Sequence, residues 1–137
     1  MEHRLEEVDR IDGVLYVNDS KATNVASTLV ALAAFDAPVH LILGGQGKGQ
    51  DFAPMKAAVA SARIYLIGED AERIGRAVGG ERCGDLATAL DRAASRARPG
   101  DVVLLSPACA SFDQFADYEA RGRAFKELVR VRRSSGT

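Results

Sequence analysis

Residues 39–51 read VHLILGGQGKGQD, an apolar run that passes directly into a loop with four glycines and one lysine. A run that is apolar almost throughout is typical of a strand buried on both faces of a parallel sheet. Residues 14–17, 64–67 and 102–105 have the same character, and segments of helical periodicity alternate with these runs. We therefore predict a Rossmann-like α/β fold: a doubly wound, mostly parallel sheet with helices on both faces.

The elements around these runs can also be assigned. Apolar residues at helical spacing follow Asn24 and Asp85, and similar stripes lie within residues 55–62 and 118–129. Gly122 lies on the apolar stripe of the last helix, which predicts that a neighbouring element approaches closely there. Residues 5–11 are heavily charged, so we place them as an antiparallel edge strand that pairs with residues 14–17 through the Asp12-Gly13 turn.

Length and composition narrow the class of protein. The chain has 137 residues, and we expect a single α/β domain over residues 1–133 and a frayed tail over residues 134–137. With 47% hydrophobic and 27% charged residues the composition is that of a folded domain. The net charge of −1 argues against binding to nucleic acid. No apolar run is long enough for a membrane span and no secretory leader is visible, so we expect a cytoplasmic protein.

Metal and thiol chemistry have few candidates. The chain has two histidines, too few for a His-rich metal site, and two cysteines, Cys83 and Cys109, with no zinc-binding spacing. We expect both cysteines to act as small buried hydrophobic residues, and we predict no metal site in this chain.

Three polar loops follow the predicted strands. They are residues 18–24 (NDSKATN), 44–51 (GGQGKGQD) and 106–113 (SPACASFD). Ligands of open α/β sheets bind outside the carboxyl ends of the strands. We therefore predict that the three loops meet at one edge of the sheet. Residues 68–70 (GED), in contrast, have the pattern of an ordinary turn and helix cap.

The glycine-rich loop suits an anionic ligand. Its glycines allow the backbone to approach a ligand, and Lys48 supplies a cation for a carboxylate or a phosphate. It is neither a Walker A motif, because Ile42 and Gly49 replace required residues, nor a dinucleotide fingerprint, because Gln50 replaces the third glycine. The alternative is a flexible connection with an exposed lysine.

The other two loops add polar groups. Lys21 precedes a predicted helix, where a cation opposes the helix dipole, so an anion shared with the helix N–H groups explains it better. Ser111 either caps the final helix or donates to a carboxylate. There is no Ser-His-Asp set, and Cys109 has no evident base. The residues alone therefore indicate a site for a polyanionic ligand without complete catalytic machinery.

These motifs carry a family resemblance. Residues 18–24, 43–48 (LGGQGK) and 105–115 (LSPACASFDQF), in this order and spacing, resemble the C-terminal domain of the Mur ligase family. His3-Arg4 and residues 118–122 (YEARG) extend the resemblance over nearly the whole chain. The sequence SKATN in the first motif is similar to the branch that adds D-glutamate. The resemblance implies an ATP-dependent amide-bond-forming ligase of bacterial peptidoglycan-precursor synthesis, whose C-terminal domain delivers D-glutamate to UDP-MurNAc-L-alanine.

The resemblance also implies roles for individual residues. The D-glutamate site would consist of Thr23, Lys48, Ser111, the backbone of Phe112 and, where the family commonly has Phe, Tyr118. The nucleotide site would contain His3, Arg4, Asp19 and Lys21. ATP would convert a substrate carboxylate to an acyl phosphate, which the D-glutamate amine attacks. The P-loop and the Mg²⁺ ligands would lie in a middle domain that is absent from this chain.

Accordingly, we expect an excised C-terminal domain that folds alone as a monomer but has no ligase activity alone. Two alternatives stay open. One is a free-standing anion- or nucleotide-binding module without catalysis. The other is the equivalent domain of a folate-polyglutamating ligase, against which the first motif argues.

Overall fold

The computed structural model describes residues 1–135, which contain a six-stranded sheet in the order β1-β2-β6-β3-β4-β5. β1 is antiparallel to β2, and all other neighbouring strands are parallel. The strands are β1 (Glu6–Ile11), β2 (Val14–Asn18), β3 (Val39–Gly44), β4 (Arg63–Ile67), β5 (Glu81–Gly84) and β6 (Val102–Leu105). The predicted α/β architecture with an antiparallel edge strand is confirmed.

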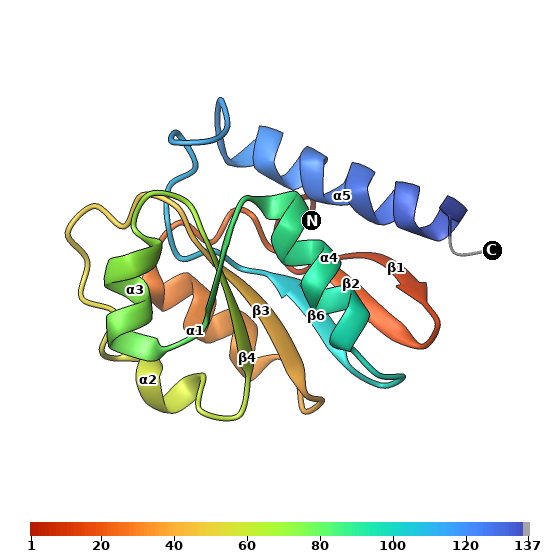
Figure 1. Cartoon of the computed structure of the whole chain (residues 1–137), viewed down its shortest axis with the longest axis horizontal. Coiled ribbons are helices and arrows are strands. Elements are labelled where there is room, and N and C mark those ends of the chain that lie inside the picture. Colours follow the sequence, from red (N-terminus) through yellow and green to blue (C-terminus); the bar gives the residue numbers. More distant parts are fainter. Residues whose placement is uncertain (136–137) are drawn as a thin grey trace.

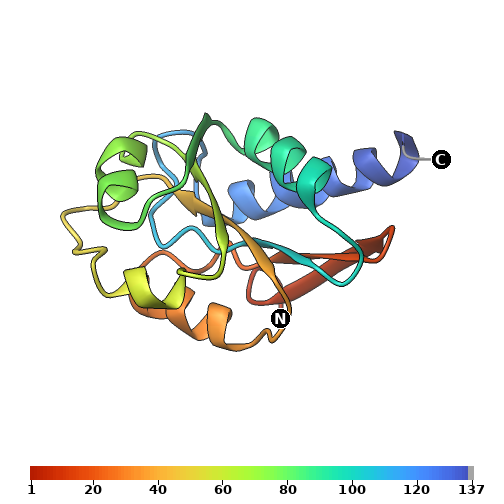
Figure 2. The ribbon, with the colours of Figure 1, turned by 60° about the horizontal axis from the view of Figure 1, so that its bottom comes forward.

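Helices cover both faces of the sheet (Figures 1 and 2). One face packs against α1 (Val25–Ala33), α2 (Met55–Ala58) and α3 (Ala71–Val78). The other face packs against α4 (Leu86–Arg96) and α5 (Tyr118–Ser135). No helix within residues 1–135 combines the length and the apolar character that crossing a membrane requires.

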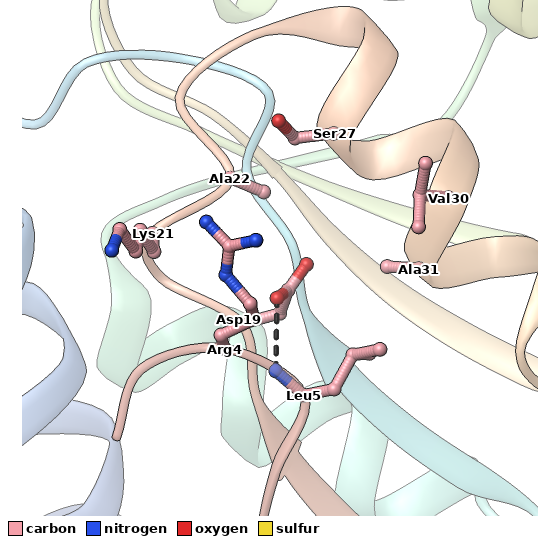
Figure 3. A pocket seen from close by; sticks show the side chains of 8 residues that line it. All are labelled: Arg4, Leu5, Asp19, Lys21, Ala22, Ser27, Val30 and Ala31. Carbon is pink, nitrogen blue, oxygen red and sulfur yellow. Dashed lines mark hydrogen bonds between the residues drawn. The ribbon is translucent and has the colours of Figure 1, made fainter. Parts of the chain in front are cut away.

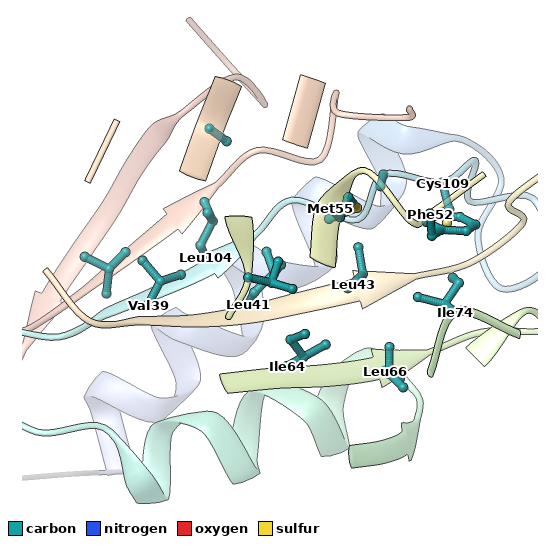
Figure 4. Close-up of a cluster of buried hydrophobic side chains, with 14 of the residues drawn as sticks. Val39, Leu41, Leu43, Phe52, Met55, Ile64, Leu66, Ile74, Leu104 and Cys109 are labelled. Carbon is teal, nitrogen blue, oxygen red and sulfur yellow. The ribbon is translucent and has the colours of Figure 1, made fainter. Parts of the chain in front are cut away.

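β3 shows why the central strands are apolar throughout. Leu41 and Leu43 enter the hydrophobic cluster beneath α1 to α3 (Figure 4), whereas Ile42 enters the cluster beneath α4 and α5. All three are fully buried. Successive side chains of a strand point to opposite faces, so a strand covered on both sides needs apolar residues at every position.

The local signals at helix ends and turns act largely as predicted. The side chains of Asn24 and Asp85 each accept a hydrogen bond from a first-turn N–H of the following helix, at 2.9 and 2.8 Å. Asp12 and Gly13 have φ of +51° and +80°, the positive values that a tight hairpin turn requires. That turn aligns Ile11 with Val14 and fixes the register of β1 against β2.

Two predicted helices differ in part from the prediction. In α1, Val25, Leu29 and Leu32 of the predicted apolar stripe pack against the core, whereas Ala33, the last residue of that stripe, is exposed. α2 ends at Ala58, because the backbone leaves the helical conformation at Val59, whose carbonyl then accepts from Ala62 in a turn leading to β4. α2 therefore has four residues, whereas the prediction extended this helix to Ala62.

α5 differs from the prediction at its end but not at its glycine. A Cβ at Gly122 would overlap the ring of His3, so the predicted close approach is confirmed. The helix continues through Ser134 and Ser135, which we expected in a frayed tail; the rest of that tail, 136–137, lies outside the described residues. Burial of Cys109 is also as expected, whereas Cys83 on β5 is only half-buried.

Candidate functional site

The three polar loops meet at the carboxyl edge of the sheet, joined by backbone hydrogen bonds. Asp19 donates its N–H to the carbonyl of Leu105 at 2.7 Å, and Ala108 donates to the carbonyl of Ala22 at 2.9 Å. Gln46 and Ala110 exchange two backbone hydrogen bonds, at 2.9 and 3.0 Å. The expectation that the three loops share one edge is therefore confirmed. We call this edge, residues 18–24, 44–51 and 106–113, the carboxyl rim.

The Gln50 side chain joins the glycine-rich loop to the start of α1 and to the loop of residues 106–113. Its Oε1 accepts from Val25 N–H at the start of α1, at 2.8 Å. Its Nε2 donates to the carbonyls of Gly47 and Ala108, both at 2.9 Å. We had considered Gln50 only as the residue that replaces the third glycine of a dinucleotide fingerprint. An amide that offers both a donor and an acceptor on a glycine-rich loop is the signal that could have identified it.

The glycine-rich loop is a defined structure, held by a carboxylate that we had assigned to an ordinary cap. Asp70 makes no cap hydrogen bond with its side chain; instead it accepts from Gly47 N–H at 2.6 Å. Gly44, with φ of +132°, packs so closely against β4 that a Cβ would overlap the Ile67 carbonyl. The GED segment therefore shapes the rim, which corrects the prediction of a simple turn, and Lys48 is presented from a fixed loop.

Lys48, Ser111 and Phe112 form one part of the rim. The Lys48 ammonium lies 5.5 Å from the centroid of the Phe112 ring, and that ring is 61% exposed. Ser111 is 2% exposed, and its hydroxyl finds no hydrogen-bond partner among the described residues. Ser111 does not cap α5, because Asp117 accepts from Ala120 N–H there, at 2.7 Å. An unpaired buried hydroxyl is the exception in folded proteins, and a ligand atom is one explanation for it.

A pocket of about 130 Å³ lies between the N-terminal segment and α1 (Figure 3). Arg4, Asp19 and Lys21 line it, so three of the four residues predicted for the nucleotide lie together. The Asp19 carboxylate accepts from Leu5 N–H at 3.0 Å and from the Ser106 hydroxyl at 2.7 Å. Burial nevertheless raises the pKa of Asp19. Figure 3 shows the Arg4 guanidinium beside this carboxylate, with Lys21 at the edge of the pocket.

Of the remaining predicted residues, Thr23 belongs to the carboxyl rim, whereas His3 and Tyr118 lie outside it. His3 is buried outside this pocket, and its Nδ1 lies 2.9 Å from Nδ2 of Asn18. The Tyr118 ring meets the His3 ring edge-on, with centroids 5.9 Å apart. Thr23 is half-buried between Ala22 and the cap of α1. The structure thus brings Lys48 together with Phe112, Arg4 with Asp19 and Lys21, and His3 with Tyr118.

Three cations at the rim or next to it form no ion pair. Among residues 1–135, no carboxylate lies within ion-pair distance of Arg4, Lys21 or Lys48. A free carboxylate or phosphate would supply the missing charge and would also satisfy a hydroxyl donor such as Ser111. Within the same range, no three His, Cys, Asp or Glu side chains gather closely enough to hold a metal ion. The arrangement of these cations and hydroxyls can therefore bind an anion.

Arg121 is a second residue whose role was not predicted from the sequence. It belongs to the motif YEARG, yet its side chain is 1% exposed and reaches two of the rim loops. Its position four residues before Phe125 places it on the buried face of α5, and this spacing is the signal that could have identified it.

Comparisons with known proteins agree with the motifs. The model of the family described as "Mur ligase, glutamate ligase domain" matches residues 3–109. A UDP-N-acetylmuramoylalanine–D-glutamate ligase of Myxococcus xanthus is 55% identical over 133 residues, which cover 93% of this chain and 29% of that protein. The chain thus spans about three tenths of the length of the curated relatives it matches.

Solved structures show the same fold at low identity. The bifunctional folylpolyglutamate synthase/dihydrofolate synthase of Yersinia pestis has a TM-score of 0.68 at 17% identity, over 94% of this chain and 32% of that one. A Haemophilus ducreyi domain, described as part of a UDP-N-acetylmuramate:L-alanyl-gamma-D-glutamyl-medo-diaminopimelate ligase, has a TM-score of 0.58 at 14% identity, over 96% and 98% of the two chains. Because the family model matches residues 3–109, this chain belongs to the Mur ligase family and corresponds to the glutamate ligase domain of that family.

Proposed function

We propose that this chain is the amino-acid-delivering C-terminal domain of a bacterial, ATP-dependent ligase that adds D-glutamate to UDP-N-acetylmuramoyl-L-alanine. The relative from Myxococcus xanthus supports this activity, because its name gives the same reaction and it is 55% identical to the chain. The folate enzyme resembles the chain at only 17% identity, so the D-glutamate branch is favoured over a folate-polyglutamating ligase. In this proposal, the UDP-linked substrate and the Mg²⁺ ions are held by the part of the ligase outside this chain.

The observation that carries the proposal is the buried hydroxyl of Ser111, which has no hydrogen-bond partner among residues 1–135 and directly precedes Phe112, over whose ring the Lys48 ammonium lies. D-Glutamate has two carboxylates, so it can accept a hydrogen bond from Ser111 with one and pair with Lys48 through the other. The Phe112 N–H and the Thr23 hydroxyl are further donors for this ligand. In this proposal, Tyr118 flanks the amino acid from the side of His3.

The nucleotide occupies the pocket of Arg4, Asp19 and Lys21 in this proposal. Arg4 and Lys21 suit phosphate oxygens, because both are cations without a carboxylate in ion-pair distance among residues 1–135. The Asp19 carboxylate can accept from a ribose hydroxyl, and His3 supports the segment that carries Arg4. When bound, ATP supplies the activation of a carboxylate. In this proposal, the residues of this chain hold and orient the two ligands, and the complete ligase is a cytoplasmic monomer.

The test is the substitution Lys48→Ala in the complete ligase that carries this domain. Loss of a charge-assisted contact to a carboxylate is expected to raise the KM for D-glutamate about 100-fold, with little change in the KM for ATP. Lys56→Ala is the matched control, because Lys56 is an exposed lysine on α2, away from the rim loops. Unchanged D-glutamate kinetics would remove Lys48 from the site. A complete protein without ligase turnover would instead favour a binding module.

A further inference from the structure

Arg121 is the largest fully buried side chain among the described residues, and it is charged. It lies in the first turn of α5 and extends into the interior behind the carboxyl rim. Burial lowers the pKa of its guanidinium to about 10, so the group remains positively charged at neutral pH. The protein therefore encloses a full positive charge directly beneath its candidate site.

All the hydrogen bonds of this guanidinium go to two of the rim loops. Nε donates to the Ser20 hydroxyl at 2.8 Å and Nη2 donates to the Ser20 carbonyl at 2.7 Å. Nη1 donates to the carbonyl of Cys109 at 2.9 Å. The Ser20 hydroxyl in turn donates to the carbonyl of Tyr118 at 2.7 Å, which ties the first loop to the start of α5. Arg121 is thus a cross-link between residues 18–24 and residues 106–113.

This cross-link is a costly way to stabilise a fold. Among residues 1–135, no carboxylate lies within ion-pair distance of Arg121, so its guanidinium donates only to neutral acceptors and Asp113 attracts it only from a longer distance. Well-packed apolar side chains commonly stabilise a protein as well as buried ionic groups do, or better. Packing alone therefore does not explain an arginine at this position. The planar set of N–H donors of the guanidinium explains it, because these donors reach two loops at once.

The two loops that Arg121 joins carry different halves of the proposed site. Ser20 directly precedes Lys21, at the pocket proposed for the nucleotide. Cys109 lies two residues before Ser111, the hydroxyl proposed for D-glutamate. The direct bond from Ala108 N–H to the Ala22 carbonyl lies between the same two loops. A displacement of either loop would therefore change the distance between the two halves.

We propose that Arg121 is the positioning residue of this site: it fixes the loop of Lys21 against the loop of Ser111, so that the nucleotide and the amino acid are held in one geometry. The identity of the two ligands rests on the proposed function. The coupling of the two loops does not, and it can be measured without any ligand.

The first experiment follows amide hydrogen exchange by NMR in the chain itself, which contains both hydrophobic clusters. In Arg121→Lys, one flexible ammonium replaces a rigid fork and cannot hold both loops. Protection of the Ala108 N–H, which joins the two loops, is expected to fall about tenfold. Protection of the Gly47 N–H, which Asp70 holds on the third loop, is expected to change less than about twofold. Arg123→Lys, an exposed position on the same helix, is the matched control.

Ser20→Ala provides a second variant that keeps the buried charge. It removes the hydroxyl that Arg121 and Tyr118 share, so a smaller fall at Ala108 is expected, again without an effect at Gly47. This variant decides the question if Arg121→Lys does not fold. Equal loss of protection at Ala108 and Gly47, or no loss at either, would overturn the proposal, because Arg121 would then contribute only to global stability or to nothing measurable.

The second experiment uses the complete ligase. With Arg121→Lys, KM is expected to rise about threefold or more for both ATP and D-glutamate, because both halves of the site are displaced. A residue that only stabilises the fold would lower kcat through a smaller active fraction and leave both KM values unchanged, and that result would overturn the proposal. A ligase that does not use D-glutamate would contradict the proposed function, but the exchange experiment would still decide the role of Arg121.

Discussion

A polar cluster is buried at each end of the parallel strands: at their amino ends, here called the amino edge, and at their carboxyl ends, the carboxyl edge. The two clusters differ in how completely they are hydrogen-bonded. At the amino edge, His40 at the start of β3 lies between Tyr65 and Asp101. Its Nδ1 is 3.0 Å from the Tyr65 hydroxyl, and its Nε2 is 2.9 Å from Oδ2 of Asp101. Asp101 also accepts from Arg98 N–H at 3.0 Å. Both ring nitrogens therefore have partners.

At the carboxyl edge, a few residues further along β3, not every buried polar group has a partner among the described residues. The Ser111 hydroxyl has no hydrogen-bond partner among the described residues, and no carboxylate there lies within ion-pair distance of the buried Arg121. Gly44, Gly45 and Lys48 all have positive φ, where the amino edge of β3 has none. A satisfied polar cluster stabilises the fold, whereas unpaired groups on strained loops cost stability. The difference indicates that the carboxyl edge is arranged for a ligand and the amino edge for the fold.

The largest effect on stability is expected for Gly44→Ala, where β3 enters the rim. The new Cβ would overlap the Ile67 carbonyl at a φ of +132°, so we expect unfolding to become easier by about 3 kcal/mol. Gly49→Ala is the control, because its Cβ would meet nothing within 4 Å, and about 1 kcal/mol is expected there. Urea unfolding measures both, and equal losses would show that the rim has no need of close packing at Gly44.

A smaller effect is expected for Asp101→Ala at the amino edge. Removal of the carboxylate leaves the Arg98 N–H and the His40 ring without their acceptor, at a cost of about 2 kcal/mol. Asp36→Ala, at an exposed aspartate, should change the unfolding free energy by less than about 0.5 kcal/mol. A similar effect of the two substitutions would mean that the amino-edge cluster does not stabilise the fold.

The same variant has a pH signature. The Arg98 N–H and the His40 ring lower the pKa of Asp101, so the folded protein binds its proton less readily than the unfolded chain. The carboxylate therefore stabilises the fold above its unfolded pKa of about 4, and this contribution is lost as the pH falls through the lower folded pKa. The gap between wild type and Asp101→Ala should narrow below about pH 4. A gap that stays constant down to pH 2 would contradict this account.

The fold and the site could be predicted from the sequence to different degrees. The buried runs of β2, β3, β4 and β6 have an unambiguous apolar pattern, and the loops after three of these strands had to share one edge. The strand order could not be predicted, because it depends on packing between distant segments. Nor could the roles of Asp70 and Arg121, since a carboxylate in a turn and an arginine on a helix are ordinary in sequence and acquire their functions only through contacts.

The central claim is that the carboxyl edge leaves a buried hydroxyl free for a ligand, and Ser111→Ala tests it most directly. Two quantities are measured: the free energy of unfolding of the chain, and the KM for D-glutamate of the complete ligase. We predict that stability changes by less than about 0.5 kcal/mol and that KM rises about tenfold. Ser106→Ala, whose hydroxyl donates to Asp19, should lose roughly 1.5 kcal/mol. Loss of stability in Ser111→Ala with an unchanged KM would contradict the account.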